Sequence, residues 1–214
     1  MTHICLVRHG ETDWNYRQIV QGSTNIPLNS RGREQALETA GYLGEEKWDA
    51  IYSSPLSRAY ETARIIGKET GFSSIPTDTR LEERHFGEAE GIPVADLQNF
   101  YRNKTIPGAE SRDEVQRRAV EVLEDLQRKH AGGRIIAVAH GGLIASILSC
   151  FSNGEILPGE PPLKNSCMNL LSYDGKWRIV WYNRTAGEAQ DTATVAEENR
   201  DTAAVAGKTR FPGV

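Results

Sequence analysis

Two apolar segments of this chain each end at a histidine that is followed by glycine. The first, residues 3–7, leads into Arg8 and His9, and the second, residues 134–139, leads into His140. Short, continuous apolar runs are typical of strands that are buried on both faces of a parallel sheet. Because the carboxyl ends of parallel strands meet at one edge, where binding sites form, we expect His9 and His140 on the same rim.

Helix and strand patterns alternate along the rest of the chain. Helices are predicted to begin near Ser30 and to cover residues 56–70, 111–131 and about 143–151. Further strands are predicted over residues 49–53, 168–173 and 176–182, and Asp174-Gly175 between the last two is a hairpin signal. This alternation predicts a three-layer α/β/α sandwich with a mostly parallel central sheet.

Charge and hydropathy argue against several classes of protein. The net charge is −4 and no long basic run is present, so nucleic acid is not an expected partner. No apolar stretch approaches the roughly 20 residues that span a bilayer, and no secretion signal opens the chain, so we expect a cytoplasmic protein that does not enter membranes. Three widely spaced cysteines predict reduced thiols and neither a disulfide framework nor a zinc site.

The composition changes near residue 187. Residues 1–186 are expected to form one catalytic domain, and residues 187–214 a flexible tail rich in Ala, Thr and Glu. The alternative is that the tail docks on this domain or on a partner.

The residues around the first histidine suit phosphate chemistry. Gly10 permits a tight turn and a close approach of ligand to backbone, and Arg8 offers a planar fork of donors for phosphate oxygens. The segment Leu6 to Asn15 resembles the Arg-His-Gly signature of the histidine phosphatase superfamily, which is phosphoglycerate-mutase-like in fold. Three further segments resemble motifs of this family in the same order: residues 53–63, 81–91 and 139–142.

The resemblance implies a role for each of these positions. His9 is the expected nucleophile and forms a phosphohistidine, with its other ring nitrogen held by an acceptor, expected to be a main-chain carbonyl. Glu83 is the expected general acid and base, and the adjacent Glu82 is the alternative. The expected catalytic and phosphate- or substrate-binding positions around them are Arg8, Asn15, Gln21, Gly22, Arg58 and a protonated His140.

These assignments lead to an expected activity. The chain resembles most the bacterial broad-specificity phosphatases of this branch, and this implies hydrolysis of small phosphorylated metabolites without metal or cofactor, with a mildly acidic optimum. Specificity is expected to lie in the loop from Gly87 to Gly108. Four aromatic residues are candidates to contact the leaving group, with core packing as the alternative: Trp14, Phe86, Phe100 and Tyr101. A cofactor-dependent phosphoglycerate mutase and a non-catalytic phosphate-binding module are the alternative functions.

Overall fold

A five-stranded sheet forms the centre of the computed structural model, which describes residues 1–97, 106–152, 155–157 and 162–188. Its strands are β1 (Thr2–Arg8), β2 (Ala50–Ser53), β3 (Arg134–Ala139), β4 (Met168–Tyr173) and β5 (Trp177–Arg184). They lie in the order β2-β3-β1-β4-β5. β3 pairs in parallel with both β1 and β2, whereas β4 and β5 extend the sheet in antiparallel fashion. The mostly parallel centre predicted from the sequence is confirmed.

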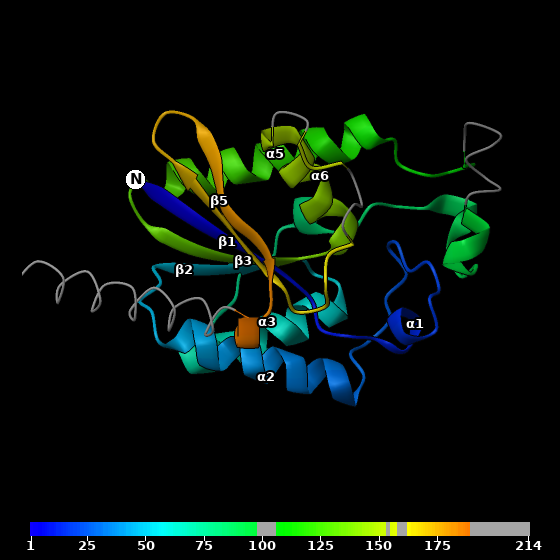
Figure 1. The fold of residues 1–214 in the computed structure, drawn as a ribbon, viewed down its shortest axis with the longest axis horizontal. Helices are drawn as coiled ribbons and strands as arrows, with labels where there is room; N and C mark the ends of the chain where they lie inside the picture. The colour runs from blue at the N-terminus through cyan, green and yellow to red at the C-terminus, as the bar shows by residue number, and fades with distance from the viewer. Residues whose placement is uncertain (98–105, 153–154, 158–161, 189–214) are drawn as a thin grey trace, which may run out of the picture.

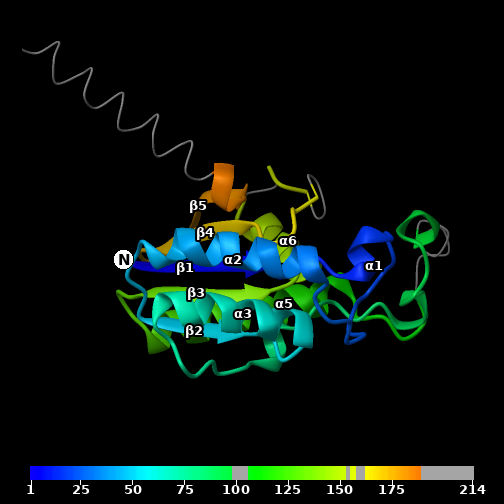
Figure 2. The ribbon, with the colours of Figure 1, turned by 90° about the horizontal axis from the view of Figure 1, so that it is seen from below.

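Helices cover both faces of this sheet (Figures 1 and 2). The α-helices are α1 (Asp13–Tyr16), α2 (Ser30–Gly44), α3 (Ser57–Thr70), α5 (Arg112–Lys129) and α6 (Gly141–Phe151), and short 3-10 turns lie at Thr79–Leu81, Gly87–Ala89 and Val94–Asp96. α2 and α3 lie on one face, and α5 and α6 lie on the other (Figure 1). The three-layer arrangement is therefore as predicted.

The apolar runs of the sequence are strands that are buried on both faces. In β1, Ile4 and Leu6 pack in the cluster beneath α5 and α6, whereas Cys5 and Val7 pack beneath α2 and α3. Successive side chains of a strand point to opposite faces, so a strand covered on both sides needs apolar residues at every position.

Local sequence signals set most of the element boundaries. Ser111 forms a capping box with Glu114 at the start of α5, and Gly71 ends α3 with a φ of +85°, in the left-handed region that glycine adopts without strain. Several boundaries differ from the prediction by one or two residues: β5 ends at Arg184 rather than at residue 182, and α6 begins at Gly141, two residues earlier than expected, with His140 as its N-cap. The second histidine therefore sits on the first turn of a helix.

The remaining sequence predictions concern the cysteines, the tail, the aromatic candidates and membrane insertion. All three cysteines are free thiols, and Cys5 and Cys167 are buried. Of the predicted tail, residues 189–214 lie outside the described residues, as do Phe100 and Tyr101. In the described part of the chain no helix combines the length and apolarity that crossing a membrane requires.

Candidate active site

The three parallel strands end next to one another and place the candidate residues on one rim. The backbone N–H of His9 donates to the carbonyl of Ala139 (3.0 Å), which continues the pairing of β1 with β3. On the other side of β3, the N–H of Ser54 donates to the carbonyl of Val138 (2.9 Å). His9, His140 and the start of α3 are thus fixed by the sheet itself.

Gly10 is required by a close backbone approach. A Cβ at this position would lie 2.2 Å from the carbonyl oxygen of Gly32 at the start of α2, which no side chain could tolerate. The N–H of Gly10 donates to the hydroxyl of Thr62 on α3 (3.2 Å). The turn after β1 is therefore pressed between α2 and α3, and this fixes the direction of His9.

The hydrogen bond of His9 determines which ring nitrogen is available. Nδ1 lies 2.7 Å from the carbonyl oxygen of Gly10, and because a carbonyl can only accept, Nδ1 carries the proton. The lone pair is then on Nε2. Burial, followed by the charges of Arg58 and Arg8, holds the pKa of His9 well below 6.5, so the ring is neutral at neutral pH.

His140 lies beside this ring. The two ring centroids are 5.1 Å apart, and Nε2 of His140 is 2.8 Å from the Ser54 hydroxyl. Its Nδ1 is buried and has no hydrogen-bond partner among the described residues. Burial and the charge of Arg58 lower the pKa of His140 well below 6.5. The ring is therefore neutral at neutral pH, whereas the protonated form expected from the sequence belongs to the site with a phosphoryl group bound.

Arg58 is a fully buried cation in the first turn of α3. Its two terminal nitrogens donate to the carbonyls of Gly22 (2.7 Å) and Thr24 (2.8 Å), and burial lowers its pKa to about 10. A helix N-terminus repels a cation, so this position is unfavourable unless anions are close. Arg8 points along the same rim, and its terminal nitrogen donates to the carbonyl of Leu163.

The other three candidates, Asn15, Gln21 and Gly22, also lie near this rim. Oδ1 of Asn15 accepts from the N–H of Thr12 (3.1 Å) and from Nδ2 of Asn165 (3.3 Å), so its own amide can act toward a ligand only as a donor. Gln21 is buried, with Oε1 2.9 Å from the Thr12 hydroxyl. Gly22 has a φ of +55° and contributes the carbonyl that holds Arg58.

Glu83 rather than Glu82 faces the rim. Its carboxylate accepts the N–H groups of Gly142 (2.9 Å) and Leu143 (3.1 Å) in the first turn of α6 and that of Arg84 (2.8 Å). An open cleft of about 500 Å³ is lined by both Glu83 and Arg8, together with Arg84, Phe86, Arg112 and Leu163. Glu82 does not line this cleft.

Three residues outside the expected catalytic and binding set also complete the rim. Ser54 contacts His140, Thr62 holds the turn at Gly10, and Asn165 donates to the carbonyl of His9 (3.3 Å). Ser54 and Thr62 lie inside the segment 53–63 that resembles a family motif, and this resemblance is the sequence signal that could have identified them. The partner of Asn165 is more than 150 positions away in the chain, and no local pattern marks it.

Nothing in the described part of the chain resembles a metal centre. No group of three or more His, Cys, Asp and Glu side chains there is arranged to hold a metal ion.

The two buried histidines are expected to make stability depend on pH. Their pKa values are well below 6.5 in the folded chain but return to about 6.5 on unfolding. Between these values the unfolded chain binds more protons, so stability falls as pH drops below 6.5, by up to about 1.4 kcal/mol per pH unit for each ring. Urea unfolding at several pH values should show that the free energy of unfolding depends less steeply on pH in His140→Asn than in the wild type. Equal slopes would contradict the assignment.

Comparisons with known proteins agree with this geometry. The sequence profile of the histidine phosphatase superfamily (branch 1) matches residues 4–185. An uncharacterised phosphatase, PhoE, of Bacillus subtilis is 38% identical over 184 residues, 86% of this chain and 95% of that protein. Phosphoglycerate mutase-like protein 4 of Arabidopsis thaliana is 40% identical over 193 residues, 83% of this chain and 84% of that protein. A phosphoserine phosphatase mutant of Entamoeba histolytica, solved with phosphoserine, superposes with a TM-score of 0.76 at 28% identity over 86% of this chain and 97% of that one.

Proposed function

The chain belongs to the histidine phosphatase superfamily, branch 1, and is a phosphatase; from this premise we propose that it hydrolyses small phosphate monoesters through a phosphohistidine on His9, without a metal ion. Glu83 serves as general acid and then as general base. Arg8, Arg58 and His140 bind the phosphoryl group, and Asn15, Gln21 and Gly22 complete its surroundings.

One observation carries this proposal: buried nitrogen atoms around the nucleophile have no hydrogen-bond partner among the described residues. Nε of Arg8, Nε of Arg58 and Nδ1 of His140 are buried and find no partner among the described residues. Buried polar groups without partners are costly, so a site that contains several is built for a ligand that satisfies them. A phosphoryl group brings acceptor oxygens and negative charge to this site, and its charge also favours protonation of His140.

The first half-reaction uses the tautomer that the structure fixes. Nε2 of His9 attacks phosphorus in line with the ester oxygen while Nδ1 keeps its bond to the Gly10 carbonyl. The arginines stabilise the equatorial oxygens as charge spreads over them. Glu83 protonates the leaving oxygen, so the products of this step are an alcohol and phosphorylated His9.

The second half-reaction reverses the role of Glu83. Its carboxylate takes a proton from a water molecule that attacks the phosphohistidine and releases inorganic phosphate. The cleft next to Glu83 is open to solvent and has room for both the leaving group and this water. Its mixed lining of Arg84, Arg112, Phe86 and Leu163 suits small organic phosphates.

A mutase is the second candidate, because one relative carries a mutase-like name. A mutase must keep the phosphohistidine from water until it is returned to the substrate. Between Glu83 and His140 the described chain provides the loop that carries Glu83 (residues 81–91, the acid loop), short 3-10 turns, one long helix, α5, and β3, and the cleft beside Glu83 is open to solvent. This supports hydrolysis over transfer.

Hydrolysis of p-nitrophenyl phosphate in EDTA, from about pH 4.5 to 8.5, tests the proposal. We expect turnover that EDTA does not reduce, together with release of inorganic phosphate from 3-phosphoglycerate without formation of the 2-isomer. Loss of activity in EDTA that added metal restores would overturn metal independence. Formation of the 2-isomer would favour the mutase, and phosphate binding without turnover would favour a binding module.

A further inference from the structure

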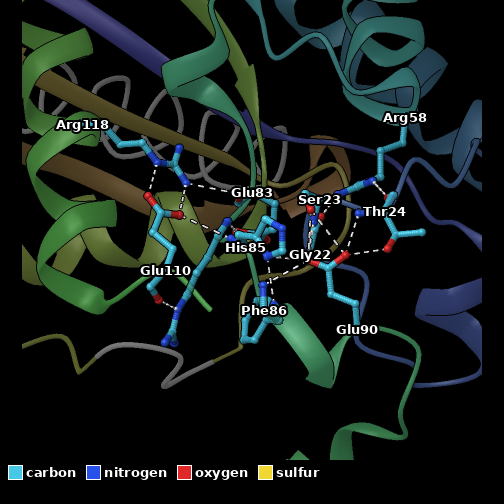
Figure 3. Close-up of polar contacts among 12 residues, drawn as sticks. Gly22, Ser23, Thr24, Arg58, Glu83, His85, Phe86, Glu90, Glu110 and Arg118 are labelled. Atoms are coloured by element: carbon cyan, nitrogen blue, oxygen red, sulfur yellow. Dashed lines mark hydrogen bonds and ion pairs between the residues drawn. The ribbon is translucent and has the colours of Figure 1, made fainter. Parts of the chain in front are cut away.

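Glu90 lies at the centre of a hydrogen-bond network that the proposed mechanism does not use. Its side chain is only 12% exposed, and its carboxylate accepts the backbone N–H groups of Ser23, Thr24 and Phe86, each at 3.0 Å. The hydroxyls of Ser23 and Thr24 donate to the same carboxylate at 3.1 and 2.5 Å. Figure 3 shows this carboxylate between the two segments that it joins.

One of these segments holds the buried arginine. The N–H of Ser23 and the carbonyl of Gly22 belong to the same peptide group, which donates to Glu90 at one end and accepts from Arg58 at the other (2.7 Å). Its dipole is therefore aligned between an anion and a cation, which strengthens both bonds. The Thr24 carbonyl accepts a second bond from Arg58 (2.8 Å), so residues 22–24 form a bridge from Glu90 to Arg58.

The other segment carries the general acid. The N–H of Phe86, three residues after Glu83, donates to Oε1 of Glu90, the same oxygen that accepts from Ser23. On its opposite side the acid loop is held by Arg118 of α5, which donates to the carbonyls of Glu82 (2.6 Å) and Glu83 (3.1 Å). The loop is thus fixed at residues 82–83 by α5 and at Phe86 by Glu90 (Figure 3).

The negative charge of Glu90 helps it to hold these two segments together. Burial alone would raise the pKa of Glu90, but the bonds from Thr24, Ser23 and Phe86 outweigh burial and lower it. The carboxylate therefore stays ionised when the site binds a phosphate ester. A Cβ on Gly22 would lie 2.1 Å from Oε1 of Glu90, so glycine at position 22 is also what lets the carboxylate approach.

We infer that Glu90 is a positioning residue. It fixes Arg58 through the bridge of residues 22–24, and it fixes the loop of Glu83 through the N–H of Phe86. This inference rests on the proposed function. A carboxylate that joins both parts should influence phosphate binding, through Arg58, and leaving-group protonation, through Glu83. A carboxylate that only stabilises the fold would influence neither in the folded enzyme.

Glu90→Gln tests this inference, with Glu88→Gln as the matched control because Glu88 is exposed on the same loop. Gln removes the charge and cannot accept all of these bonds. In Glu90→Gln we expect the inhibition constant of inorganic phosphate to rise about ten-fold and kcat to fall about ten-fold or more, with a greater loss for an alkyl phosphate than for p-nitrophenyl phosphate. Glu90→Asp, which keeps the charge, should recover part of both effects.

Thr24→Val provides a second route if Glu90→Gln does not fold, since it removes only one donor to Glu90. It should weaken phosphate binding by a smaller factor in the same direction. Variants that melt at a lower temperature but keep the phosphate affinity and the leaving-group dependence of Glu88→Gln would overturn the inference. Phosphate affinity can be measured by calorimetry without turnover, so this result is separable from failure of the proposed hydrolysis.

Discussion

Replacement of His9 by alanine is expected to lower kcat for p-nitrophenyl phosphate by roughly 10⁴-fold or more, because it removes the atom that we propose as the phosphorylated nucleophile. Arg8, Arg58 and His140 would still bind phosphate, so KM should change far less than kcat. The measurement is steady-state hydrolysis combined with acid-free detection of phosphorylated protein after rapid quenching. Wild-type protein should carry a phosphoryl group on His9, and the variant should carry none.

His9→Asn is the matched control for the shape of the site. The amide nitrogen of Asn can replace Nδ1 as the donor to the Gly10 carbonyl, which His9 contacts at 2.7 Å, but Asn has no counterpart of Nε2. We expect it to fold at least as well as His9→Ala and to be equally inactive. Turnover or protein phosphorylation that survives in either variant would exclude His9 as the nucleophile.

The features that the sequence predicted well are those with a local cause. Continuous apolar runs identify strands buried on both faces, and this alone placed His9 and His140 at neighbouring strand ends. The capping box at Ser111 and the glycine after α3 are likewise encoded within a few residues. The expected main-chain acceptor for His9 is also present, because the carbonyl of Gly10 is the neighbour in the chain.

Features that depend on distant partners could not be predicted in this way. Glu90 and Ser23 are 67 positions apart, and His140 and Ser54 are 86 apart, so no periodicity connects them. The lowered pKa of His140 has a similar origin, because it results from complete burial next to Arg58, and neither can be known before the chain is folded.

Glu83→Gln should slow hydrolysis of an alkyl phosphate by roughly 10²–10⁴-fold and that of p-nitrophenyl phosphate much less, because p-nitrophenolate leaves without a proton. The structure indicates which oxygen carries that proton. Among the described contacts, Oε1 accepts two N–H groups, from Arg84 and Leu143, whereas Oε2 accepts that of Gly142 alone. Oε2 therefore keeps a lone pair free for a proton. Equal losses on both substrates would contradict the assignment of Glu83 as general acid.

Gly142→Ala moves this carboxylate without removing it. A Cβ at Gly142 would lie 2.6 Å from Oε1 of Glu83, so the Glu83 side chain must shift. The intrinsic helix propensity of alanine exceeds that of glycine by up to about 1 kcal/mol, which offsets the cost of this shift to the fold. Gly41→Ala in α2 is the matched control, since a Cβ there meets nothing within 4 Å. We expect both variants to fold and only Gly142→Ala to lose activity, more on the alkyl phosphate than on p-nitrophenyl phosphate. If the two variants behave alike, the bonds from α6 to Glu83 do not set its catalytic position, and the acid would act from another arrangement of the loop.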